Sequence, residues 1–265
     1  MPFPEPGGVK PLAIPAANQK KRIQQIADIL EGHLGRPAKP RRRSNPLDTL
    51  IATLLSQNTN DQNSYKAWLN LRRRFPTWED VVSAPKRDVA KSIEVGGLKN
   101  QKAQRIQAIL RSVHHERGSY SLDFPDEKTN EDIMLYLMSM KGVGTKTAAC
   151  VLVFSLGRDV FPVDTHIHRI CNRLGLVRTK SADGTYETMS ELVPEGRAYS
   201  FHVNLIRFGR QTCKAGKPLC GDCVLFEQCL FPEKETYAAL RVTARGLSKK
   251  RSRFLITEQI SRDRA

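Results

Sequence analysis

The sequence lacks the features that mark membrane and secreted proteins. It has no run of apolar residues approaching the roughly 20 that a membrane-spanning helix needs. Residues 1–8 show neither the basic-then-apolar layout of a signal peptide nor the amphipathic layout of an organelle presequence. With 40% hydrophobic and 26% charged residues in a chain of 265, the composition is that of a globular protein. We therefore expect a cytoplasmic protein.

Acidic residues are scarce for the number of basic ones. The chain has 43 Lys and Arg against 27 Asp and Glu, a net charge of +16. Residues 1–43 and 241–265 each carry +6, which leaves +4 for the middle. This surplus favours a polyanionic partner, because Lys and Arg that bind phosphates release condensed counterions. The alternative is a solvated surface that binds nothing; a membrane surface is disfavoured because neither end shows a clear amphipathic basic helix.

Alternating apolar and polar residues, the pattern of β-strands, are nearly absent, and helical spacing takes their place. Residues 36–43 form a basic linker broken by prolines, after which Asn45 and Pro46 suit the cap and first position of a helix. Helical patterns occur at 19–34, 47–56, 61–75, 87–95, 100–117 and 130–140. We predict an all-α fold.

The six cysteines are unevenly distributed. Cys150 and Cys171 stand alone in apolar helical sequence and are expected to be small buried hydrophobes. The other four crowd into one short stretch: Cys213, Cys220, Cys223 and Cys229. A chain of this size does not need disulfides to hold its core together, and it lacks an export signal. The four therefore favour ligation of a metal or a cluster.

Two glycines separate the helix predicted at 130–140 from a second helix that starts at Thr145. The connecting segment reads Lys141-Gly142-Val143-Gly144. Glycine permits positive φ and a close approach of the backbone, and free main-chain N–H groups at the start of a helix can bind an anion such as a phosphate. The alternative is an ordinary tight connection between two helices.

Two charged residues follow at helix starts. Lys146 lies in the first turn of the second helix, where the helix dipole and partial burial both disfavour its charged form, so it is a candidate amine nucleophile. The alternative is a lysine that points to solvent. Asp164 begins the next helix, in Val163-Asp164-Thr165, where its ordinary role is that of an N-cap.

Three segments together resemble the endonuclease III family of DNA glycosylases. Residues 137–148 resemble its helix-hairpin-helix, residues 161–173 resemble its aspartate-bearing segment, and the spacing C-x6-C-x2-C-x5-C resembles its iron–sulfur loop. The resemblance covers about residues 20–231. It implies a two-lobed helical protein whose parts are listed here: a flexible arm (1–16), an N-terminal helix and linker packing with the cluster lobe (17–43), a six-helix barrel with the hairpin (44–158), the cluster lobe (159–231) and a basic C-terminal extension (232–265).

The resemblance also implies a chemistry. Lys146 would attack the sugar C1′ of a base turned out of the stack, and the resulting Schiff base would permit β-elimination at the abasic (AP) site. Asp164 would activate the lysine and stabilise positive charge on the sugar. Relatives that only remove mismatched adenine or thymine carry another residue in place of Lys146. The adenine enzymes also have a glutamate in the helix matching 50–55, where this chain has no carboxylate between Asp48 and Asp61.

This favours a bifunctional glycosylase and AP lyase that acts on oxidised pyrimidines in double-stranded DNA, as a monomer associated with the nucleoid. The alternatives are a monofunctional mismatch glycosylase and a DNA-binding protein of this fold without catalysis. The hairpin, Gly142, Val143, Gly144 and Thr145, would bind a DNA phosphate.

Two loops resemble those that hold the opened duplex in this family. Gln57 or Asn58 would fill the gap left by the flipped nucleotide, and the sequence does not decide between them. Leu98 would wedge against the orphaned partner base. Outside the family context, Gln57 is a polar helix end and Leu98 a core residue. His166 would either contact DNA or cap its own helix.

The spacing of the four clustered cysteines distinguishes two kinds of site. A four-cysteine zinc site usually has two close pairs, and here only Cys220 and Cys223 form one. The spacing therefore favours a [4Fe–4S] cluster. A loop pinned by a cluster would present Lys217 rigidly to DNA phosphates.

Overall fold

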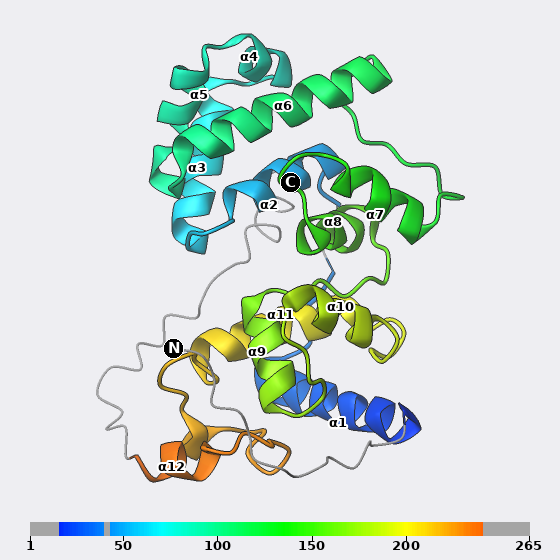
Figure 1. Cartoon of the computed structure of the whole chain (residues 1–265), viewed down its shortest axis with the longest axis vertical. Helices are drawn as coiled ribbons and strands as arrows, with labels where there is room; N and C mark the ends of the chain where they lie inside the picture. The colour runs from blue at the N-terminus through cyan, green and yellow to red at the C-terminus, as the bar shows by residue number, and fades with distance from the viewer. Residues whose placement is uncertain (1–15, 40–42, 241–265) are drawn as a thin grey trace.

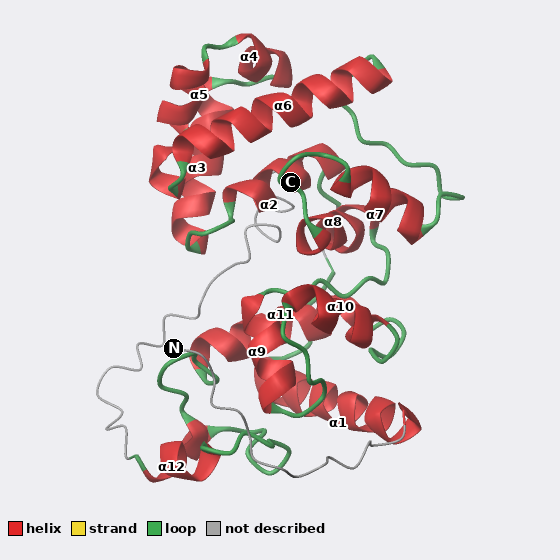
Figure 2. Cartoon of the chain, in the orientation of Figure 1, coloured by secondary structure: helices red, strands yellow, loops and turns green. Residues whose placement is uncertain are grey.

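The computed structural model describes residues 16–39 and 43–240, and within these ranges every regular element is helical (Figure 2). The all-α prediction is confirmed. No helix in the described ranges combines the length and the hydropathy required to cross a membrane. The elements are α1 Ala16–Leu34, α2 Pro46–Leu55, α3 Asp61–Arg74, α4 Trp78–Ser83, α5 Lys86–Ser92, η1 Glu94–Gly96, α6 Lys99–Arg117, α7 Asn130–Met138, α8 Thr145–Val151, η2 Leu152–Leu156, α9 Thr165–Arg173, α10 Ala182–Ser190, α11 Ala198–Gln211, η3 Cys220–Asp222 and α12 Lys234–Ala239.

Local capping explains where several of these helices begin. The Asn45 side chain accepts a hydrogen bond from Leu47 N at 2.9 Å and Pro46 opens α2, as predicted. The short helix α4 begins with a capping box, in which Thr77 and Asp80 each accept a hydrogen bond from the other's backbone N–H. The helical pattern did not reveal α4, but this Thr-x-x-Asp signal could have done so.

The helices form two lobes, each with its own hydrophobic core (Figure 1). The first lobe contains α2 to α8, and all ten residues of α2 are buried in it. The second lobe contains α9 to α12 together with α1, which packs against α11 although it opens the described chain. A small cluster, with Cys150, Val153 and Phe154 on one side and Tyr199 and Val203 on the other, joins α8 and η2 to α11.

The end of the described chain is helical where only a basic extension was expected. Helix α12 packs against η3, and the Phe231 and Tyr237 rings stack with centroids 6.0 Å apart. Lys234 Nζ also donates to the Phe226 carbonyl at 3.0 Å. The folded part of the chain therefore reaches Leu240, and the basic stretch 241–265 lies outside the described residues.

Candidate functional site

Helices α7 and α8 form a hairpin whose turn depends on glycine. Gly142 has φ of +92°, and a Cβ added to it would lie 2.7 Å from Arg105 Cδ on α6. Val143 is buried and its N–H donates to the Met140 carbonyl at 3.0 Å, which fixes the turn from inside. Gly144, by contrast, is exposed and caps α8 without a side chain. The first N–H groups of α8 therefore follow an exposed turn residue that has no side chain.

Gly142→Ala is expected to lower the free energy of unfolding by about 1–3 kcal/mol, because alanine resists positive φ and would displace Arg105. Gly144→Ala is the matched control: its φ is −105°, nothing lies within 4 Å of an added Cβ, and the change should stay within about 0.5 kcal/mol. Urea unfolding of both variants measures the difference. Equal losses would contradict this account of the turn.

Lys146 and Asp164 lie at the starts of two helices, α8 in the first lobe and α9 in the second. Lys146 is in the first turn of α8 and is half-buried. Asp164 caps α9, with Oδ1 accepting from Ile167 N at 2.9 Å. Capping occupies one carboxylate oxygen, and an ionised carboxylate has further acceptor sites on the other. Asp164 is thus the N-cap of α9, and its other carboxylate oxygen can still take part in a second interaction.

Two buried side chains that sequence reasoning did not connect with this site lie next to it. Burial raises the pKa of the Cys150 thiol, which hydrogen-bonds to Lys146 and also feels the Asp164 charge. His202, 1% exposed, lies against the Pro162 carbonyl, with its Nδ1 at 2.8 Å. A carbonyl only accepts, so Nδ1 carries the proton. Lys146 and Asp164 therefore share two buried neighbours, Cys150 and His202.

The protonation state of His202 follows from its surroundings. Burial lowers its pKa to about 4; Asp164 and the Pro162 carbonyl oppose that shift, while Lys146 and Arg210 add to it. The imidazole is consequently neutral at physiological pH. It holds the Pro162 carbonyl two residues before Asp164 and so helps to set the start of α9.

The two loops singled out in the sequence contain an unusual backbone feature. Among the described residues, the only non-glycine residues with positive φ are Asn58, at +52°, and Leu98, at +48°. Asn58 is exposed, and the Leu98 side chain is 50% exposed. Left-handed backbone costs a leucine about 1–2 kcal/mol. An exposed apolar side chain on such backbone is typical of a functional loop rather than of a core residue.

Gln57 has a different environment from Asn58. Its Nε2 donates to the Gly142 carbonyl at 3.2 Å and to Thr147 Oγ1 at 3.3 Å. Gln57 is therefore held by the hairpin, while its neighbour Asn58 projects from the loop. The two alternatives that the sequence left open thus differ clearly in the structure.

His166 and Lys217 both belong to the second lobe, His166 on α9 beside Asp164 and Lys217 on the cysteine loop. His166 Nδ1 lies 3.1 Å from Arg169 Nη2, and burial lowers the pKa of the imidazole. The cap of α9 is provided by Asp164. Lys217 is exposed on the loop after α11. An ion pair between Arg210 on α11 and Asp61 at the start of α3 connects the two lobes close to the Asn58 loop.

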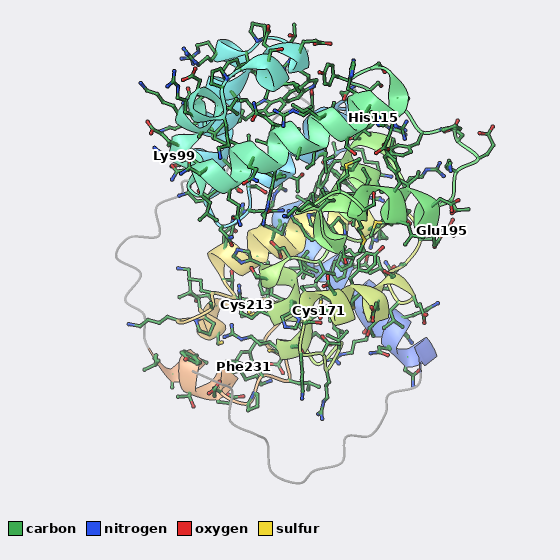
Figure 3. All side chains as sticks on the ribbon, turned by 45° about the horizontal axis from the view of Figure 1, so that its top comes forward. Lys99, His115, Cys171, Glu195, Cys213 and Phe231 are labelled. Atoms are coloured by element: carbon green, nitrogen blue, oxygen red, sulfur yellow. The ribbon has the colours of Figure 1, made fainter. Side chains whose placement is uncertain are left out.

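The four clustered cysteines line one pocket of the second lobe, together with Arg173 and Phe231. Figure 3 labels Cys213 and Phe231 in this lobe. None of the chain's cysteines forms a disulfide. Arg169 donates to the Cys213 carbonyl at 2.8 Å, and Arg173 donates to the carbonyls of Lys214 and Ala215 at 2.7 and 2.9 Å. The cysteine loop is therefore anchored to α9 by two arginines.

The donor set and its layout bear on which inorganic group fits. Within the described ranges, no three His, Cys, Asp or Glu side chains converge closely enough to hold a single metal ion. A [4Fe–4S] cluster takes one thiolate at each iron, so its four ligands surround it rather than converge on one atom. Four free thiols around one pocket fit that requirement.

Comparison with known proteins finds relatives of this chain both in sequence and in structure. A model of the HhH-GPD superfamily of base excision DNA repair proteins matches residues 51–195. Endonuclease III of Thermotoga maritima is 35% identical over 190 residues, covering 72% of this chain and 85% of the relative. Endonuclease III of Escherichia coli is 31% identical over 217 residues, covering 82% and 98%. A structure of a trapped endonuclease III–DNA covalent intermediate superposes with a TM-score of 0.70 at 28% identity, covering 82% of this chain and 97% of the other.

Proposed function

The chain belongs to the endonuclease III family of base excision DNA repair proteins, and we propose that it removes oxidised pyrimidines from duplex DNA and cleaves the resulting AP site with Lys146 as nucleophile. The observation that carries this proposal is an amine and a carboxylate at two helix starts that have the same buried neighbours. Lys146 and Asp164 lie around the same two buried side chains, Cys150 and His202. A protein that only binds DNA has no need of that pair.

The reaction proceeds in two stages at the sugar. The Lys146 amine attacks C1′, the glycosidic bond breaks, and the base leaves with the bonding electrons and takes up the proton that the attacking nitrogen loses. Opening of the sugar ring at the C1′–O4′ bond, with O4′ taking up a proton from solvent, gives a protonated Schiff base. Loss of the C2′ proton then drives the C3′–O bond electrons onto the 3′ phosphate, which is the β-elimination, and hydrolysis returns the amine. The Asp164 carboxylate stabilises the positive charge that develops on the sugar.

The flipped nucleotide requires the duplex to be held open. The hairpin of Gly142–Thr145 binds a backbone phosphate through the free N–H groups of its turn and of α8. Leu98 enters the stack and offsets part of the lost stacking. Asn58, rather than Gln57, fills the gap, because Asn58 projects from the loop and Gln57 is hydrogen-bonded to the hairpin. Both inserted residues sit on left-handed backbone and are exposed.

A [4Fe–4S] cluster would be held by Cys213, Cys220, Cys223 and Cys229. When bound, it would cross-link four positions of a loop that no disulfide joins, and no catalytic step would pass through it. Arg169 and Arg173 anchor the same loop, which would present the exposed Lys217 to DNA phosphates.

Borohydride trapping tests the proposal directly. Duplexes containing thymine glycol, an AP site or a mismatched adenine are incubated with the holoenzyme and reduced, which converts a Schiff base into a covalent adduct visible on a denaturing gel. We expect an adduct with thymine glycol and with the AP site. Lys146→Ala should abolish both adducts, because it removes the amine that forms the Schiff base, while Lys91→Ala, which removes an exposed lysine of α5, should leave them unchanged.

Three other results would overturn parts of the proposal. Trapping with the AP site alone would keep the lyase and remove oxidised pyrimidines as substrates. Excision of mismatched adenine or thymine without any trapping would favour a monofunctional glycosylase that activates water. Binding of the duplex with neither excision nor trapping would leave only a DNA-binding protein.

A further inference from the structure

Beneath the two DNA-opening loops lies a lysine that the reaction does not use. Lys102, in the first turn of α6, is 1% exposed and is among the largest fully buried side chains of the described residues. Lysine is almost never fully buried unless its ammonium is paired or hydrogen-bonded. Its Nζ donates to the Leu55 carbonyl at 2.8 Å and to the Gly96 carbonyl at 2.7 Å. These two carbonyls belong to different segments of the chain.

Each of those carbonyls lies where one of the two loops begins, which we call the root of that loop. Leu55 is the last residue of α2, three residues before Asn58, and Gly96 is the last residue of η1, two residues before Leu98. The two roots lie against each other, since a Cβ added to Gly96 would be 3.9 Å from the Leu55 carbonyl oxygen. The backbone N–H of Lys102 also donates to the Leu98 carbonyl at 2.9 Å. One residue therefore holds both loops.

The same two loops hold the strained backbone. Asn58 and Leu98 are the non-glycine residues with positive φ within the described ranges. Such conformations persist only where the surroundings over-determine them. The Leu55 carbonyl also lacks an intrahelical partner, because it lies at the C-terminus of α2, and the ammonium supplies one. Fixing the carbonyls at both roots is a direct way to hold two outward-pointing residues in register.

We propose that Lys102 is a positioning residue that sets the spacing of Asn58 and Leu98, so that gap filling and wedging occur together when the duplex opens. This inference rests on the proposed function, in which those two residues enter the DNA. Lys102 itself stays buried and touches no nucleotide. Burial lowers the pKa of its ammonium to about 8, so it is still mostly charged at neutral pH and a strong donor to both carbonyls.

The chain provides a matched control on the same helix. Gln107, also on α6 and 3% exposed, donates from Nε2 to the Val81 carbonyl at 2.9 Å and to the Ala84 carbonyl at 2.8 Å. It thus joins two carbonyls around the end of α4, which belong to neither loop. Lys102→Met and Gln107→Met each remove two buried hydrogen bonds to backbone carbonyls, from a charged donor in the first and a neutral donor in the second, and only the first touches the loops.

The experiment uses the holoenzyme and a duplex with a tetrahydrofuran AP-site analogue opposite 2-aminopurine, whose fluorescence rises when it is unstacked. At saturating protein, Lys102→Met should reduce the fluorescence increase at least fivefold and the single-turnover rate of thymine glycol excision at least tenfold. Gln107→Met should leave both within twofold of the unaltered protein at matched folded fraction. Lys102→Arg, which keeps a charged donor, should restore part of the signal.

A double variant separates this inference from the proposed function. Leu98→Ala should itself reduce the fluorescence increase, and adding Lys102→Met to it should then cost less than twofold more. Full fluorescence in Leu98→Ala would refute the wedge, and with it the premise. A loss in Leu98→Ala without one in Lys102→Met, or equal losses in Lys102→Met and Gln107→Met, would refute Lys102 as the positioning residue alone. If Lys102→Met does not fold, Lys102→Gln, which keeps a shorter donor, takes its place in the same comparison.

Discussion

Asp164→Asn is expected to slow single-turnover excision of thymine glycol by about 10²–10³-fold and to leave the free energy of unfolding within about 0.5 kcal/mol. The two effects separate because Asp164 has two roles. Asparagine caps a helix about as well as aspartate, so its side-chain oxygen can keep the hydrogen bond from Ile167 N. It carries no negative charge, so it cannot stabilise the positive charge that forms on the sugar or on Lys146.

Asp164→Ala is the second half of this experiment. It removes the cap as well as the charge, so it should excise as slowly as Asp164→Asn and also lose about 1 kcal/mol of stability. Rates are measured with enzyme in excess over thymine glycol duplex, and stabilities by urea unfolding. An Asp164→Asn protein that excises at the rate of the unaltered chain would reduce Asp164 to an N-cap.

The features that were predicted most accurately are those that depend on residues close together in the sequence. The hairpin, the first-turn position of Lys146 and the cap at Asp164 each depend on a few consecutive residues, because turns and caps are local structures. Helices α11 and α12 were not predicted. Neither helix begins with a side-chain cap hydrogen bond, so a capping residue did not indicate where it starts. The short helix α12 is stabilised by packing on η3, which periodicity does not reveal.

Features that depend on distant segments could not be predicted. In the sequence Lys102 is one of several lysines near the start of a helix, and only the packing of α6 against α2 and η1 buries it. Cys150 was expected to be a small buried hydrophobe and is indeed buried, but its contact with Lys146 was not foreseen. The choice between Gln57 and Asn58 depends on a single φ angle and on a hydrogen bond to a hairpin 85 residues away.

The last prediction concerns acid stability. His202 has an ordinary pKa of 6.5 in the unfolded chain and a pKa of about 4 in the folded protein. Between these values the unfolded state binds more protons than the folded state, so lowering the pH favours unfolding. A shift of this size corresponds to about 3 kcal/mol, present in full above pH 6.5 and lost progressively as the pH falls toward 4.

His202→Asn isolates this contribution. Its amide N–H₂ can still donate toward the Pro162 carbonyl, but it does not titrate in this range. Unfolding free energies are measured in urea at pH 7, 6, 5 and 4 for both proteins. The carboxylates and His166 are common to both and cancel in the difference, so the unaltered chain should lose about 3 kcal/mol more than the variant between pH 7 and 4.

Parallel pH curves for the two proteins would mean that His202 can take up a proton without leaving its place in the fold. The groups that face it make this unfavourable. Asp164 is the only one that supports a charged imidazole through its own charge, while Lys146 and Arg210 both oppose it. Protonation at Nε2 would keep the Nδ1–H bond to the Pro162 carbonyl, but it would leave a buried positive charge beside Lys146 and Arg210. Excision should therefore fall over the same acid range in which His202 destabilises the fold.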